Sequence, residues 1–241
     1  MRLQKSNTFY CFSPPVMIAT FAIEIAFIIF TVWRYKLNKL AKLVIASLTF
    51  LAIFQFVEYF ICTTGNSYNE LLSRIGYIAI TMLPPLGIHI ITTIKKFRGS
   101  AYLVAAAYIS AFAFISWFLL SSGSLTGHAC QGNYVIFHVD KAVTWFYGLY
   151  YFGWVMTGLV ISAVQGARSK VNIKTKQALY GVALGYAGFV IPTTTANFLN
   201  AHTLRSIPSI MCGFAVILAI TFVTIVLPNA GQRKQRKITS K

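Results

Sequence analysis

Runs of about 20 apolar residues recur along nearly the whole chain, and they restrict the fold more than any other feature of the sequence. A transmembrane helix needs about 20 consecutive, mostly apolar residues to cross about 30 Å of hydrocarbon. Seven such runs occur, at residues 16–33, 43–63, 75–94, 101–120, 142–165, 178–199 and 207–227. Because a single segment in lipid satisfies its own backbone only as a helix, we predict an all-α fold, a polytopic membrane protein with a seven-helix bundle.

The composition leaves no room for a second, soluble domain. The 241 residues are 57% hydrophobic and 10% charged, whereas soluble domains carry about 25% charged residues. Connections are short, the longest covering residues 121–141, and no internal repeat is visible. We predict one membrane domain over residues 1–241 that ends in a basic tail, 229–241. The first apolar run follows Pro14 and Pro15 and lacks a small-residue cleavage site, so we expect a retained span rather than a signal peptide.

The basic residues predict how the chain is threaded through the membrane. Sixteen of the 21 lysines and arginines lie after the first, third, fifth and seventh runs: Arg34, Lys36, Lys39, Lys42, Lys95, Lys96, Arg98, Arg168, Lys170, Lys174, Lys176, Arg233, Lys234, Arg236, Lys237 and Lys241. Since cytoplasmic segments are enriched in lysine and arginine, we predict a cell-membrane protein with its N-terminus outside and its C-terminus in the cytoplasm. The tail should contact anionic lipids of the inner leaflet. The net charge of +17 is thus explained without nucleic-acid binding.

Two of the four acidic residues, Glu24 and Glu58, lie within predicted spans. A charge at the centre of a membrane helix costs at least about 2.5 kcal/mol on insertion scales. Polar residues share one helix face in two sets: Ser47, Gln55, Glu58 and Cys62, and Thr20, Glu24 and Thr31. Both faces should point into the bundle. One interpretation is that the carboxylates hold helices together; the other is that they bind protons, cations or a ligand.

Prolines predict two interrupted helices. Pro84 and Pro85 remove two backbone donors, so a kink should free the carbonyls near residues 80 and 81 for serine or threonine side chains, water or a ligand. His89 follows one turn later, and we favour a packing role for it over a ligand role. Pro192 should open the sixth span beside Thr194 and Asn197. Both interrupted helices could line one cavity.

The predicted outer side carries the cysteines. Cys11 and Cys130 lie in loops that can approach each other, so we favour a disulfide between them, since the exterior is oxidising. A metal site through "GHAC" (127–130) is an alternative, but the spacing does not match a zinc pattern, and we predict no metal. The segment "FHVDKAVTWFYGLYYFGW" (137–154) is typical of an interfacial aromatic belt, with Asp140 and Lys141 as a surface ion pair.

Four motifs resemble an uncharacterised family of small bacterial multi-pass membrane proteins. They are "CFS" (11–13), "FQFVE" (54–58), "HACQGNY" (128–134) and "IPSIMCGFAVILA" (207–219). The second helix of that family reads Gln-Gln-x-x-Glu-Gly, where this chain has Phe54 and Tyr59. The stretch "SRIGYIAITMLPPLGIHI" (73–90) is also similar to the third helix of the seven-helix sensor region that precedes some histidine kinases. That family has no established activity, so the resemblance supplies neither an activity nor a cofactor for this chain.

Missing motifs exclude several functions of seven-helix proteins. The last predicted span has no lysine for retinal, and the residues inside spans offer too few histidines for an intramembrane zinc hydrolase or a haem protein. We therefore do not expect an enzyme. Two functions remain: a bundle that binds or senses a small ligand in an outward-facing polar cavity and signals to a cytoplasmic or membrane partner protein, or a small proton- or cation-coupled transporter that uses its intramembrane carboxylates.

Overall fold

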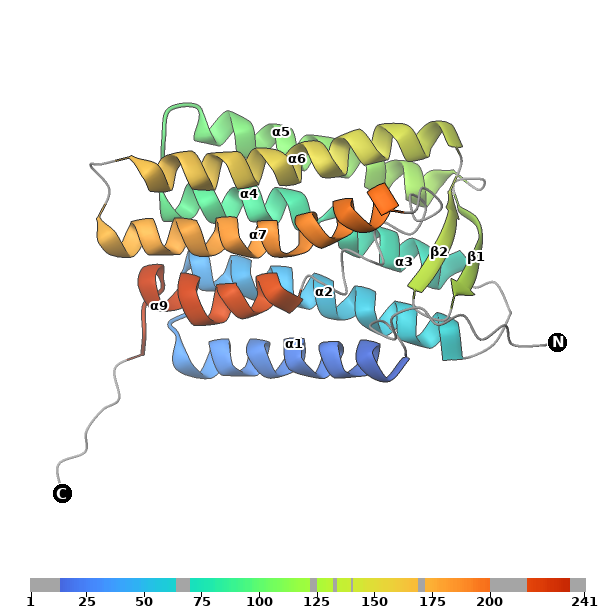
Figure 1. Ribbon diagram of the computed structural model, residues 1–241, viewed down its shortest axis with the longest axis horizontal. Coiled ribbons are helices and arrows are strands. Elements are labelled where there is room, and N and C mark those ends of the chain that lie inside the picture. Colours follow the sequence, from blue (N-terminus) through green and yellow to red (C-terminus); the bar gives the residue numbers. More distant parts are fainter. Residues whose placement is uncertain are drawn as a thin grey trace, which may run out of the picture.

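Long helices lie side by side along one axis in the computed structural model (Figure 1). The structure describes residues 14–63, 70–121, 125–131, 134–139, 141–168, 172–199 and 216–234. The helices are α1 (Pro14–Arg34), α2 (Lys39–Thr63), α3 (Glu70–Thr81), α4 (Leu83–Ile94), α5 (Ser100–Leu120), α6 (Lys141–Ala167) and α7 (Ile173–Leu199). The segment Val216–Ala230, here called the C-terminal helix, follows and contains the π-helical turn η2 (Phe222–Val226) and the final turn α9 (Leu227–Ala230).

Five helices are long and apolar enough to cross a membrane, which indicates a membrane protein. They are Pro15–Arg34, Lys39–Ile61, Glu70–Ile94, Ser100–Leu120 and Val143–Ala167, and the third of them combines α3 and α4. The sixth predicted span falls in α7, which is long enough but is not among these five. The described part of the seventh, Val216–Ala230, is a shorter apolar helix. The helical fold is therefore confirmed, with five helices able to cross a membrane, and the number of spans stays a prediction.

A β-hairpin connects α5 to α6 and was not part of the predicted fold. Strands β1 (Leu125–Gln131) and β2 (Tyr134–Val139) pair antiparallel, with Gln131 opposite Tyr134 at the turn and an irregularity between Leu125 and Gly127. The hairpin lies across one end of the bundle (Figure 1), which we call the hairpin end. The bundle itself is all-α, as predicted.

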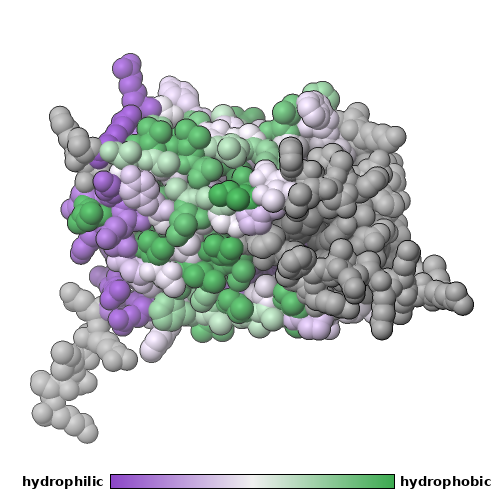
Figure 2. Space-filling view, viewed as in Figure 1, coloured by the Kyte–Doolittle hydropathy of each residue, from purple (hydrophilic) through white to green (hydrophobic). Residues whose placement is uncertain are grey.

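The helix α3–α4 is the most buried of the five, whereas α1 and α5 lie at the periphery. On α5 only Ala107, Ala111 and Phe118 are buried, at spacings of four and seven, so one narrow stripe faces the protein. The rest of α5 exposes large apolar side chains such as Ile109 and Phe112. Such faces are expected where hydrocarbon rather than water surrounds a helix. Figure 2 shows hydrophobic residues over the middle of the described surface.

Glycines on α7 allow the C-terminal helix to pack closely. A Cβ atom on Gly181 would lie 2.7 Å from Ile225 Cγ2, and one on Gly188 would lie 2.7 Å from Ile217 Cγ2. Gly185, between them, faces Leu218, whose Cα would be 3.2 Å away. Small residues at spacings of three and four are the usual contact surface between membrane helices.

Most of the described basic residues, with Arg74 as an exception, gather at the end opposite the hairpin, which we call the basic end. Figure 2 shows hydrophilic residues there. The connections at this end carry Arg34, Lys36, Lys39, Lys42, Lys95, Lys96, Arg98, Arg168, Lys174, Lys176, Arg233 and Lys234. The chain after the C-terminal helix is tied to the α1–α2 connection, because Lys36 N donates to Gln232 O at 2.7 Å and Lys234 N donates to Arg34 O at 3.0 Å. The segregation that the sequence predicted is therefore present in space.

Candidate functional site

Glu24 lies on the inward face of α1. The predicted polar face is confirmed, since Thr20, Glu24 and Thr31 are all buried and Glu24 has no exposed surface. Neither threonine hydroxyl donates to the carboxylate. Thr20 Oγ1 donates instead to Met17 O at 2.9 Å, and Thr31 Oγ1 donates to Phe27 O at 2.7 Å. Within the described part of the chain, neither carboxylate oxygen of Glu24 has a hydrogen-bond partner. A buried polar group in this condition costs several kcal/mol in a fully apolar medium.

Gln55 and Glu58 occupy the inward face of α2. Their exposed fractions are 2% and 1%, and Ser47 is buried on the same face. Ser47 Oγ donates to Leu43 O at 3.0 Å, so this hydroxyl is satisfied within its own helix. The amide nitrogen Nε2 of Gln55 has no acceptor among the described residues. The side chain of Cys62, also predicted for this face, lies outside the described residues.

The contact between Phe21 and Phe56 gives the relative positions of Glu24, Gln55 and Glu58 along the bundle axis. The two ring centroids are 5.7 Å apart, and α1 and α2 are antiparallel neighbours (Figure 1). At 1.5 Å per residue, Glu24 therefore lies about 3 Å closer to the basic end than Gln55 and about 8 Å closer than Glu58. Gln55 and Glu58 lie in the half of the bundle nearer the hairpin end, and Glu24 lies near the middle of α1.

Ser73 of α3 adds a fourth polar group that the sequence analysis missed. Gly76 packs against α2, since a Cβ atom there would lie 3.2 Å from Val57 Cγ1 and 3.5 Å from Phe54 Cδ2. Ser73 lies one turn before Gly76 on α3 and is fully buried, near the depth of Glu58. Its hydroxyl has no hydrogen-bond partner among the described residues. We call Glu24, Gln55, Glu58 and Ser73 the polar layer. Serine one turn before a glycine on a predicted span is the signal that could have identified it.

The predicted interruption in the third span is confirmed, because α3 ends at Thr81 and α4 begins at Leu83. The proline nitrogen of Pro85 cannot donate to Thr81 O, as a normal residue would four positions later. A tyrosine from α6 replaces it, since Tyr150 Oη donates to Thr81 O at 2.6 Å. The sequence analysis expected a serine or threonine side chain, water or a ligand at this carbonyl, whereas the structure places a tyrosine hydroxyl of a neighbouring helix there.

A second tyrosine completes the connection at the interruption. Thr81 Oγ1 donates to Tyr77 O at 2.6 Å and lies 3.1 Å from Tyr147 Oη. The rings of Tyr77, Tyr147 and Phe118 pack together, with centroids 5.0 to 5.6 Å apart. These aromatic side chains pack together in the core beside the helix break.

The interpretation of residues 137–154 as an interfacial aromatic belt was incomplete. Tyr147, Tyr150 and Tyr151 are buried in the bundle core, whereas Trp145 and Phe146 are 67% and 63% exposed. The buried tyrosines follow spacings of three and one, so they form an inward stripe on α6. Helical spacing within the aromatic run was the available signal for this division.

His89 lies apart from the polar layer. It is on α4, about two turns closer to the basic end than Thr81. Its Nδ1 atom is 3.2 Å from Tyr108 Oη of α5, and the two rings are nearly perpendicular at 88°. This half-buried histidine connects two helices, which is the packing role that the sequence analysis favoured.

Thr194 of α7 is also separate from the polar layer. The helix continues from Ile173 to Leu199 through Pro192, so the predicted opening at this proline does not end the helix. Thr194 is exposed, and its Oγ1 donates to Val190 O at 2.9 Å. The side chain of Asn197 lies outside the described residues, as do Cys11 and the side chain of Cys130, so the structure leaves their predicted roles untested.

No protein-family profile matches this chain, and no curated protein shows significant sequence similarity to it.

Proposed function

We propose that this chain is a seven-helix protein of the cell membrane that binds a small polar ligand in its hairpin-end half and passes the change to a cytoplasmic or membrane partner protein. The orientation, with the N-terminus outside, is supported by the basic end, because lysine and arginine favour the cytoplasmic side. Seven spans fit the lengths of α7 and of the apolar segment that includes the C-terminal helix. The predicted resemblances to multi-pass and sensor proteins agree with this function.

One observation carries the proposal: buried donors and acceptors at neighbouring depths lack partners within the described residues. They are both carboxylate oxygens of Glu24, Nε2 of Gln55 and Oγ of Ser73. Buried polar groups in proteins are nearly always hydrogen-bonded, and ionisable residues inside membranes mark functional sites. A ligand with at least one donor for the carboxylate and one acceptor for the amide would complement them.

The break between α3 and α4 allows the effect of ligand binding to reach the basic end. Ser73 lies on α3, before the break, and α4 continues toward the basic end (Figure 1). Because the prolines remove backbone hydrogen bonds at the break, the two halves can change their relative tilt at low cost. Binding at Ser73 would thereby reach the connection between α4 and α5.

The second candidate function is proton- or cation-coupled transport. Glu24 and Glu58 favour it, because two fully buried carboxylates at depths about 8 Å apart could pass a proton or cation along the bundle axis. On this reading Pro84 and Pro85 act as the hinge of alternating access.

Native mass spectrometry of the protein purified in mild detergent tests the binding function. We expect a retained small molecule that is lost from Glu24→Gln, because the amide replaces one acceptor oxygen with a donor. Glu70→Gln is the matched control, since it makes the same change at a half-exposed glutamate paired with Arg74. Equal retention by both variants would contradict the proposal. Proton- or cation-linked uptake by protein-containing liposomes that Glu58→Gln abolishes would instead support transport.

A further inference from the structure

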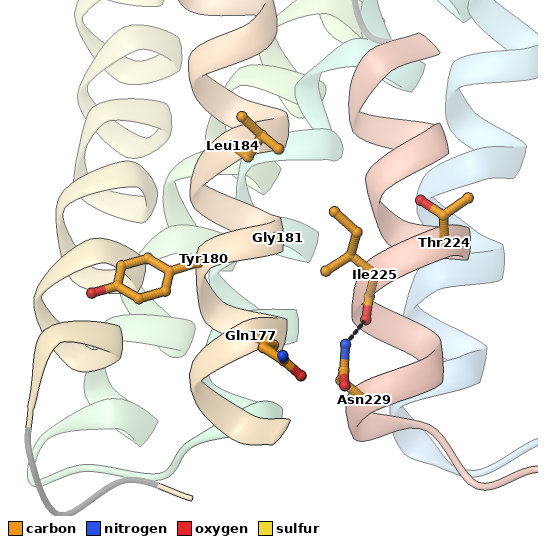
Figure 3. A pocket seen from close by; sticks show the side chains of 7 residues that line it. All are labelled: Gln177, Tyr180, Gly181, Leu184, Thr224, Ile225 and Asn229. Atoms are coloured by element: carbon orange, nitrogen blue, oxygen red, sulfur yellow. Dashed lines mark hydrogen bonds between the residues drawn. The ribbon is translucent and has the colours of Figure 1, made fainter. Parts of the chain in front are cut away.

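A groove of about 340 Å³ lies between α7 and the C-terminal helix near the basic end. This volume is within the range of small-molecule sites. The groove is lined by Gln177, Tyr180, Gly181, Leu184, Thr224 and Ile225, with Asn229. Figure 3 shows Gln177 and Asn229 extending from the two helices toward the space between them. The groove is remote from the polar layer, so it is independent of the proposed function.

The groove is polar at one end and apolar at the other. Gln177 and Asn229 lie nearest the basic end, whereas Leu184 lies about two turns further toward the bundle middle. Between them Gly181 and Ile225 form the floor, because the helices touch there. Leu184 is 57% exposed, so this part opens toward the hydrocarbon rather than into the protein. An occupant must therefore have a polar head and an apolar chain.

Charge at the polar end selects an anionic head. Lys174 and Lys176 lie in the first turn of α7, and the ammonium of Lys176 lies 5.8 Å from the ring centroid of Tyr180, at the groove edge. Asn172 Oδ1 caps this turn by accepting from Lys174 N at 2.9 Å, and the helix dipole adds positive potential there. The described basic end contains no acidic residue, since Glu70 is at the opposite end and Glu24 and Glu58 are buried in the bundle.

We propose that this groove binds one anionic phospholipid. The phosphate lies beside Lys174 and Lys176 and accepts hydrogen bonds from the amides of Gln177 and Asn229. An acyl chain follows Gly181 and Leu184 toward the bilayer middle. The amide of Asn229 also donates to Ile225 O at 2.8 Å, which holds it at the groove (Figure 3). This is a defined site for one lipid and is distinct from general attraction of the basic end to the membrane.

Native mass spectrometry of the full chain, with phosphatidylglycerol or phosphatidylcholine of identical acyl chains, tests the site. The wild type should retain phosphatidylglycerol preferentially. The double substitution Lys174→Gln/Lys176→Gln should lower its relative affinity about 25-fold, since each basic residue near an anionic headgroup contributes roughly fivefold. Lys95→Gln/Lys96→Gln is the control, because it removes two lysines at the same end, on the connection between α4 and α5.

A second pair of variants tests the groove itself. Thr224→Trp should fill it and abolish retention, whereas Thr49→Trp should leave retention unchanged. The two threonines match, since both are exposed and both donate to the carbonyl four residues earlier. The proposal fails if Thr224→Trp retains lipid like the wild type, if both lysine pairs lose affinity equally, if phosphatidylcholine binds equally well, or if a second copy of the chain occupies the groove. Should Thr224→Trp not fold, by circular dichroism and gel filtration, the lysine pairs decide.

Discussion

Removing the hydroxyl of Tyr150 should destabilise the protein through the helix break. In Tyr150→Phe the carbonyl of Thr81 loses the donor that lies 2.6 Å away in the native structure. An unsatisfied buried group costs about 1 to 3 kcal/mol, and measured hydrogen bonds between membrane helices contribute about 0.6 and at most about 1.7 kcal/mol. We therefore expect the free energy of unfolding to fall by about 1 to 2 kcal/mol.

A double-mutant cycle with Pro85→Ala isolates the cause. Alanine at this position restores an N–H group that can donate to Thr81 O. In that background Tyr150→Phe should cost less, and the difference between the two costs should be about 1 kcal/mol. Tyr147→Phe serves as the comparison and should cost about 0.5 kcal/mol, because Thr81 Oγ1 keeps its bond to Tyr77 O.

Reversible unfolding in mixed micelles, titrated with sodium dodecyl sulfate and followed by far-ultraviolet circular dichroism, gives these free energies. Identical costs of Tyr150→Phe with and without Pro85 would refute the link between the proline and the tyrosine. The hydroxyl would then stabilise the protein in some other way.

Three further predictions concern packing, a helix end and orientation. Gly87→Ala should lower the free energy of unfolding by about 1 to 3 kcal/mol, because its Cβ would overlap Tyr186 Oη. Gly148→Ala, with nothing within 4 Å of its Cβ, should be neutral or stabilising, and equal effects of the two substitutions in thermal denaturation would contradict this prediction. Arg74→Gln should speed amide exchange at the end of α5, because Arg74 donates to Leu119 O at 2.6 Å and to Ser121 O at 3.1 Å; unchanged exchange would mean that these bonds add nothing. With native cysteines replaced, an impermeant thiol reagent outside intact cells should label Thr63→Cys and not Lys96→Cys, and the opposite pattern would invert the proposed orientation.

The helices were predictable because lipid leaves the backbone few choices. A run such as residues 101–120 is too apolar for water and too long for a strand, and α5 covers Ser100–Leu120. Faces within a helix were predictable where polar residues are rare, as for Glu24 and Thr31 on α1. The hairpin was missed because residues 125–139 lie outside the apolar runs that supplied the signal.

Contacts between helices were not predictable from one sequence. The donor for Thr81 O comes from Tyr150, 69 positions away, and no local pattern links those residues. The groove beside α7 depends equally on spacing, since Gly181 brings Ile225 close and leaves Gln177 and Asn229 apart. Residue types identified the polar layer only in part, because the depth of Ser73 follows from the packing of Gly76 against α2.

The two parts of the interrupted helix, α3 and α4, are held to the rest of the bundle by different contacts. At Gly87, just after the prolines, Tyr186 of α7 enters a slot that Gly158 of α6 completes, since a Cβ on Gly158 would lie 2.9 Å from the tyrosine ring. This slot packs α4 against α6 and α7, whereas α3 is held at the break by the hydrogen bonds of Thr81 with the hydroxyls of Tyr147 and Tyr150. On the proposed sensing function, a ligand at Ser73 would therefore change the tilt between α3 and α4, and α4 would pass the change toward the basic end together with α6 and α7. The hydroxyl of Tyr150 would then be the contact that such a movement must break or keep.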